Sequence, residues 1–179
     1  MLGRKLLVSS VVIAGLTFSL VAAAKLAKTG GAPTAGFHAV GPGGLNIDGK
    51  TSEVDVADDG TTVTITVKLG SLATGMDIRD KHTKEDLEAD KFQTATLKVA
   101  RSALQMGGGE GDAKGQLTIR DKTKEVSFHY TATKNGDALD VKGSTDILVP
   151  DYGVKVRSYL GISIKDKVGI YANFSAKDG

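Results

Sequence analysis

Long runs of this sequence alternate between polar and apolar side chains, the pattern of a β-strand with one buried face. Residues 62–69 alternate without a fault, and so do residues 125–133. Shorter runs with the same period are 53–56, 94–99, 116–120, 139–143 and 168–174. β-Branched residues fill these runs, as strands prefer. The sequence therefore predicts a protein built mainly from strands.

Short turn signals separate the runs, which favours an antiparallel sheet. Asp58-Asp59-Gly60 joins one pair, and Asn135-Gly136 is a strong hairpin signal. The glycine-rich stretch 107–111 predicts a mobile loop. With residues 45–47 included, eight strands are expected, and they either close into a barrel or split into a sandwich. A barrel leaves no exposed edge, and we expect it here.

One segment departs from the alternating pattern. Thr83 is followed by acidic residues at 85 and 86, which is typical of a helix start with Thr83 as the N-cap. We therefore expect one short helix over residues 84–90.

The first 24 residues have the pattern of a secretory signal peptide, with Arg4 and Lys5, an apolar run and then three alanines at 22–24. The apolar run is just long enough to be an uncleaved membrane anchor, but the alanines favour cleavage. Residues 25–34 are then a flexible lead-in, and the folded domain spans 35–179. The chain has no cysteine, and secretion without cysteine suits a bacterial periplasm. No stable membrane span is expected after the signal is removed.

The charge balance gives no support for nucleic-acid binding. The chain has 23 Lys+Arg and 21 Asp+Glu. Residues 1–24 contain no acid, so Arg4 and Lys5 account for the whole excess. A signal-free chain is electrically balanced, without the basic surface that a phosphate backbone requires.

The predicted inner face of the strands is apolar and almost uncharged. Such a face forms either a packed core or the wall of a cavity for an apolar ligand. The residues alone leave both readings open.

Three ordered motifs resemble the YceI-like family. Residues 71–82 are similar to its Ser-Leu-x-Thr-Gly-x-x-x-Arg-Asp-x-His segment, and residues 90–95 look like the segment that follows. Residues 115–126 resemble its Gly-x-Leu-Thr-Ile element followed by Thr-x-x-Val, and residues 151–154 its Asp-Phe-Gly-Ile. The resemblance covers residues 37–176. It implies an all-β, lipocalin-like antiparallel barrel in the periplasm that binds a polyisoprenoid lipid, such as an isoprenoid quinone or a polyprenyl phosphate.

The expected binding site is the apolar interior of the barrel. Its expected lining is Ile65, Val67, Phe92, Leu97, Leu117, Ile119, Val126, Phe128, Tyr130, Ile170 and Phe174. A polar group consisting of Asp77, Arg79, Asp80 and His82 precedes the expected helix. We interpret it as a brace at the barrel mouth, with Arg79 paired to a carboxylate, or as a lipid head-group site.

The leading hypothesis is a non-enzymatic carrier without cofactor or metal. A metal site built from His82, Glu85 and Asp86 is disfavoured because lysines interleave and no second histidine is near. One alternative is a structural or stress-response domain with a filled core that acts through a protein partner. Another is a lipid enzyme using Asp80 and His82, although no nucleophile motif occurs. The sequence leaves a homodimer open.

Overall fold

The computed structural model describes residues 26–28, 32–159 and 162–178, and the expected signal peptide at 1–24 lies outside them. The strands are β1 Leu26–Lys28, β2 Thr34–Val40, β3 Asn46–Thr51, β4 Val54–Asp58, β5 Thr62–Lys68, β6 Thr94–Ala100, β7 Gly109–Ile119, β8 Lys122–Asn135, β9 Ala138–Leu148, β10 Ser158–Tyr159, β11 Ile162–Ser163 and β12 Lys167–Asp178. The helix is α1 Asp77–Asp86, and the 3-10 turns are η1 Pro42–Gly44, η2 Leu69–Ser71, η3 Arg101–Ala103 and η4 Val149–Tyr152.

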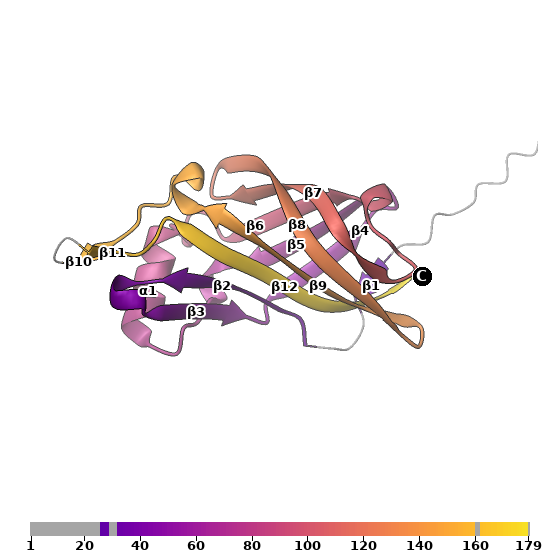
Figure 1. The fold of residues 1–179 in the computed structure, drawn as a ribbon, viewed down its shortest axis with the longest axis horizontal. Helices are drawn as coiled ribbons and strands as arrows, with labels where there is room; N and C mark the ends of the chain where they lie inside the picture. The colour runs from indigo at the N-terminus through magenta and orange to yellow at the C-terminus, as the bar shows by residue number, and fades with distance from the viewer. Residues whose placement is uncertain (1–25, 29–31, 160–161, 179) are drawn as a thin grey trace, which may run out of the picture.

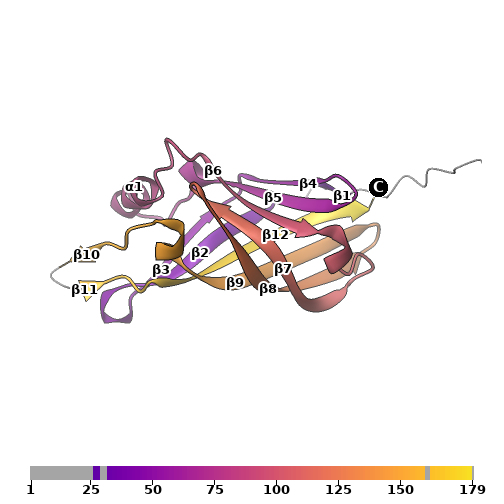
Figure 2. The same cartoon turned by 90° about the horizontal axis from the view of Figure 1, so that it is seen from above.

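The strands form one antiparallel sheet in the order β3-β2-β12-β9-β8-β7-β6-β5-β4. β3 and β4 are separated by only two residues and act as one bent strand, whose first half pairs with β2 and whose second half pairs with β5. The sheet therefore returns on itself as a nearly closed barrel (Figures 1 and 2). The expected all-β antiparallel barrel is confirmed, with nine strands on this path in place of eight.

The additional strand is β2, which the alternation did not reveal. Its inward positions are Ala35, Phe37 and Ala39, so two of the three are too small to give a strong apolar signal. β2 pairs with the first half of β12, from Gly169 to Asn173. β1 lies within the segment expected to be a flexible lead-in, and it pairs with the end of β12.

The glycine-rich stretch is partly strand, and the expectation of a loop over all of 107–111 was wrong. β7 begins at Gly109, and Gly109 to Gly111 pair with Ala132 to Tyr130 of β8. Glycines are poor strand formers by themselves, so the pairing depends on the long neighbouring strand.

The helix begins and ends earlier than the sequence predicted. α1 starts at Asp77, where the preceding chain is held by Asp80, whose carboxylate accepts hydrogen bonds from the Thr74 amide and hydroxyl, both at 2.6 Å. The helix ends at Asp86, because Glu88 takes a left-handed conformation with φ 48°. Thr83 consequently lies inside the helix and is not its N-cap. α1 packs at one end of the barrel, the same end at which β10 and β11 project (Figures 1 and 2).

Candidate ligand-binding cavity

A cavity of about 290 Å³ lies inside the barrel. Alternate residues of β5, β6, β7, β8, β9 and β12 form its wall, because successive side chains of a strand point to opposite faces. Nine of the eleven residues expected to line the interior are on this wall: Ile65, Val67, Leu97, Leu117, Ile119, Phe128, Tyr130, Ile170 and Phe174. The interior is therefore apolar and partly hollow.

The hollow is seen in the exposure of inward-facing side chains. Val63 and Val99 are 1% and 2% exposed, as in an ordinary core. In contrast, Ile65, Val67 and Leu97, which lie one or two positions further along the same inner face, are only half-buried. A side chain that faces into the barrel can keep such exposure only where the interior is not filled. The space is therefore concentrated toward the end of the barrel that carries α1.

The opposite end is closed by packed side chains. Leu104 packs against two buried clusters that contain Val99 and Tyr130 in one case and Val63 and Phe174 in the other. The Tyr130 hydroxyl accepts a hydrogen bond from the Gln105 amide at 2.8 Å, which holds the segment after η3 across the barrel. We call this the closed end and the end with α1 the open end.

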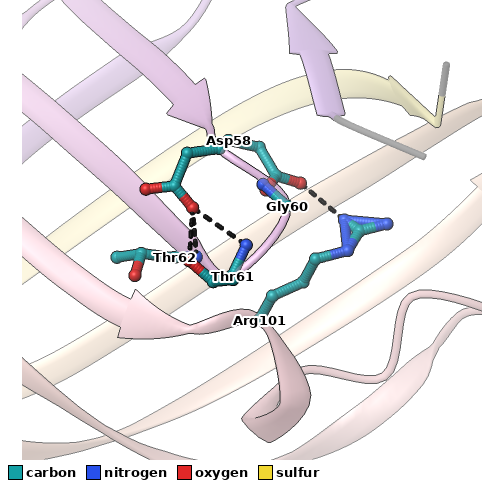
Figure 3. Close-up of polar contacts among 6 residues, drawn as sticks. Asp58, Gly60, Thr61, Thr62 and Arg101 are labelled. Atoms are coloured by element: carbon teal, nitrogen blue, oxygen red, sulfur yellow. Dashed lines mark hydrogen bonds and ion pairs between the residues drawn. The ribbon is translucent and has the colours of Figure 1, made fainter. Parts of the chain in front are cut away.

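A buried ion pair reinforces the closed end. Arg101, at the start of η3, donates from Nη1 to Oδ2 of Asp58 at 2.5 Å (Figure 3). The side chain of Asp58 is 0% exposed and that of Arg101 is 15% exposed. The second oxygen of Asp58 accepts from the Gly60 amide at 2.8 Å, so the same carboxylate orders the β4–β5 turn.

The charged residues on the cavity wall, among those that the structure describes, all lie at the open end. They are Asp86 of α1 and Lys155 and Arg157 of the segment after η4. Arg157 donates from Nε to both oxygens of Asp86, each at 2.8 Å, and from Nη2 to Glu85 at 2.8 Å. These hydrogen bonds raise the pKa of Arg157, the one to Asp86 having the largest effect, so the guanidinium stays charged. The cavity thus has a mainly apolar body and a charged mouth.

A second arginine, Arg120, connects three segments near the mouth of the cavity. Arg120, in the β7–β8 turn, donates to the Gly153 carbonyl and to the Glu88 carboxylate. Its guanidinium carbon lies 5.6 Å from the centre of the Phe92 ring. The chain just after α1, the β7–β8 turn and the end of η4 are therefore held to one another.

Two of the expected lining residues do not reach the cavity. Phe92 lies before β6 and its ring contacts Arg120 and Lys91, whose ammonium is 4.7 Å from the ring centre. Val126 packs on the cluster of Leu117, Ile119, Ile147 and Tyr152 near the mouth, without forming part of the wall. The sequence offers only the aromatic residue type as a reason to expect Phe92 in the lining. In the structure Phe92 precedes β6, and its ring lies beside Arg120.

The expected polar group lies within α1, not before it, and none of its members is on the cavity wall. Asp80 is bound to Thr74. No side-chain hydrogen bond or ion pair joins Asp77, Arg79 or His82 to another described residue. The expected pairing of Arg79 with a carboxylate does not occur among the described residues, and it is Arg157 that pairs with the helix carboxylates Glu85 and Asp86. Asp86 and Arg157 are 71 residues apart, so no local pattern could have joined them.

In the described ranges, no three or more residues of the types His, Cys, Asp and Glu come together as a metal site would need. No helix in the same ranges is long and apolar enough to cross a membrane.

The fold and the cavity define a class, the antiparallel β-barrel proteins with an apolar interior that is not fully packed. A family model described as the YceI-like domain matches residues 21–176, and the chain belongs to this family. No curated protein sequence matches the chain.

Solved structures share the fold at low sequence identity. A polyisoprenoid-binding domain from Saccharophagus degradans, implicated in plant cell wall breakdown, has a TM-score of 0.70 and 14% identity, covering 88% of this chain and 99% of its own. BcnA from Burkholderia cenocepacia has a TM-score of 0.65 and 20% identity, covering 80% and 96%. The Campylobacter jejuni YceI protein has a TM-score of 0.53 and 18% identity, covering 100% and 99%.

Proposed function

We propose that this protein carries a polyisoprenoid lipid, with the apolar chain in the barrel cavity and the head group at the open end. The observation that carries the proposal is the set of half-buried apolar side chains, Ile65, Val67 and Leu97, on the inner face. Covering these apolar side chains with a hydrocarbon chain removes them from water, which is favourable in free energy. The name of the Saccharophagus degradans domain, a polyisoprenoid-binding domain, supports this choice of ligand class.

The magnitudes allow useful affinity. A long hydrocarbon ligand that hides roughly 500 Å² of apolar surface gains about 12 kcal/mol before costs. Association costs about 4–15 kcal/mol in lost freedom. The balance favours ligands with enough isoprene units to fill the hollow over shorter ones. An isoprenoid quinone and a polyprenyl phosphate both have such a chain.

Binding accounts for the site better than catalysis does. Asp80 is bound to Thr74, and His82 lies two positions further along the helix, where side chains do not face each other. Neither residue is on the cavity wall. An acid–base pair acting on a lipid in the cavity would need both groups to reach the wall.

We also propose that the carrier works in the periplasm. The basic start, apolar run and alanines of residues 1–24 and the lack of cysteine support this location. Fractionation of cells expressing the full chain tests it. Mature protein in the periplasmic fraction is expected, whereas full-length protein in the cytoplasm would contradict it.

The central experiment is native extraction followed by mass spectrometry of the bound material. Ile65→Trp fills the hollow from the inner face of β5 and should reduce the copurifying prenyl lipid at least tenfold. Thr64→Trp is the matched control, because it adds the same side chain one position away on the outer face. If the wild-type protein carries no prenyl lipid and binds none when supplied, the proposal is wrong.

A further inference from the structure

In the part of the chain that the structure describes, the large hydrophobic side chains that are exposed lie at one end of the barrel. They are Leu45, Met76, Ile78 and Leu148, each between 46% and 55% exposed. Single exposed apolar residues are normal on a protein surface and are usually scattered. Their gathering at one end is therefore informative.

Strand pairing places these residues from three separate segments at the open end. Leu45 directly precedes β3, in the connection from β2. Leu148 ends β9 opposite Lys167, where β12 begins, and β2 approaches the same end of β12 through the pair His38 and Gly169. Met76 and Ile78 are at the start of α1. Both views show α1, the β2–β3 connection and the end of β9 at the same end (Figures 1 and 2).

The closed end differs in its surface. Its exposed apolar positions in the described chain are small, such as Ala57 of β4 and Ala103 of η3. The polar mouth of the cavity, with Asp86 and Arg157, is at the opposite end. Among the described residues, large exposed hydrophobic side chains therefore occur where the apolar cavity opens and not where it is closed.

We propose that these four residues, the apolar rim, dock on the surface of a lipid bilayer while the prenyl chain enters or leaves the cavity. The inference rests on the proposed function, because a prenyl chain that is insoluble in water is held in a bilayer before it is bound. A rim of aliphatic side chains can enter the boundary between head groups and acyl chains without a membrane-spanning element.

The size of the rim favours a bilayer over a second protein. Four half-exposed aliphatic side chains offer on the order of a few hundred Å², below the roughly 800 Å² per partner of a stable protein interface. The chain is nearly balanced in charge, with 23 basic and 21 acidic residues, so docking should depend on apolar contact and change little with salt.

The test measures transfer of dansyl-labelled geranylgeraniol from phosphatidylcholine vesicles to the mature protein. The rim variant carries Leu45→Ser, Met76→Ser, Ile78→Ser and Leu148→Ser, and the matched control carries Ala57→Ser and Ala103→Ser at the closed end. Binding of the same probe added without vesicles is measured in parallel. All four rim residues are exposed, so the variant should fold, which circular dichroism checks.

The proposal expects a wild-type transfer rate that rises with vesicle concentration. The rate should change less than about twofold between roughly 0.05 and 0.5 M salt, a range that lies on either side of the 0.1 M at which the screening length is about 10 Å. The rim variant should transfer at least tenfold more slowly, with direct probe binding unchanged. Equal transfer by the rim variant and the wild type would overturn it. So would a wild-type rate independent of vesicle concentration, because the protein would then take up probe that has first dissociated into water. If the wild-type protein does not bind the probe that is added without vesicles, the proposed function itself is overturned.

Discussion

Arg157 donates a hydrogen bond from Nε to both carboxylate oxygens of Asp86, each at 2.8 Å. This contact joins the segment after η4 to α1 at the mouth of the cavity. The two residues are 39% and 23% exposed, so water screens the pair and its energetic value is moderate. The pair matters more for the placement of α1 than for the overall stability, because it connects two elements that are far apart in the sequence.

Arg157→Met should loosen α1 more than it destabilises the whole protein. We expect a loss of about 1 kcal/mol or less in the free energy of unfolding, and roughly fivefold faster exchange of the α1 amide hydrogens. Hydrogen exchange and urea unfolding measure the two effects. Lys122→Met is the control, since among the described residues the Lys122 ammonium pairs only with its exposed neighbour Asp121, at 3.4 Å. Unchanged exchange in α1 would show that Arg157 does not hold the helix.

Asp80 should contribute to the acid sensitivity of the protein. Hydrogen bonds from the side chain and then the backbone of Thr74 lower the pKa of Asp80 below its ordinary value of 3.8. A carboxyl group whose pKa is lowered by folding stabilises the fold above its unfolded pKa, and this contribution is lost as pH falls through the folded pKa.

Asp80→Asn should therefore flatten the decrease in stability below about pH 4, where an unfolded aspartate takes up its proton. Urea midpoints at a series of pH values measure this slope. Asp77→Asn is the matched control in the same turn of α1, since the Asp77 carboxylate has no hydrogen bond with another described residue. A slope for Asp80→Asn equal to that of the wild type would contradict the role of Thr74.

The ion pair at the closed end should be important for stability and not for binding. Arg101→Met removes the guanidinium from the buried carboxylate of Asp58, and losing one member of such a pair costs about 3–5 kcal/mol. The double variant with Asp58→Asn should recover part of the loss. Thermal unfolding measures the effect. Because the pair is remote from the open end, a folded Arg101→Met protein should bind a prenyl probe as the wild type does.

Gly115 should not tolerate a side chain. A Cβ there would lie 2.8 Å from Cδ1 of Leu97 and 2.9 Å from the Lys98 carbonyl oxygen. Because the carbonyl belongs to the paired strand β6, it cannot move away cheaply, and Gly115→Ala should cost about 1–3 kcal/mol in urea unfolding. Gly70→Ala is the control: its Cβ would meet open space, and it should be neutral or stabilising by about 0.4–1 kcal/mol.

Local pattern was sufficient for much of the fold. The alternation of residues 62–69 and 125–133 identified β5 and β8, and the same period placed Ile65, Leu97 and Phe128 on the inner face. It failed for β2, where Ala35 and Ala39 are inward but small, and for α1, where the bond from Thr74 to Asp80 and the left-handed Glu88 set the bounds.

The amino-acid order alone thus determined that the chain forms an antiparallel barrel with an apolar inner face, because strand periodicity and short turns are properties of neighbouring residues. Only the tertiary structure decided how far that interior is filled, which arginine holds the mouth and where the exposed aliphatic residues gather. Those features depend on contacts such as Arg157 with Asp86, between residues that are distant in the chain and adjacent only once the sheet has closed.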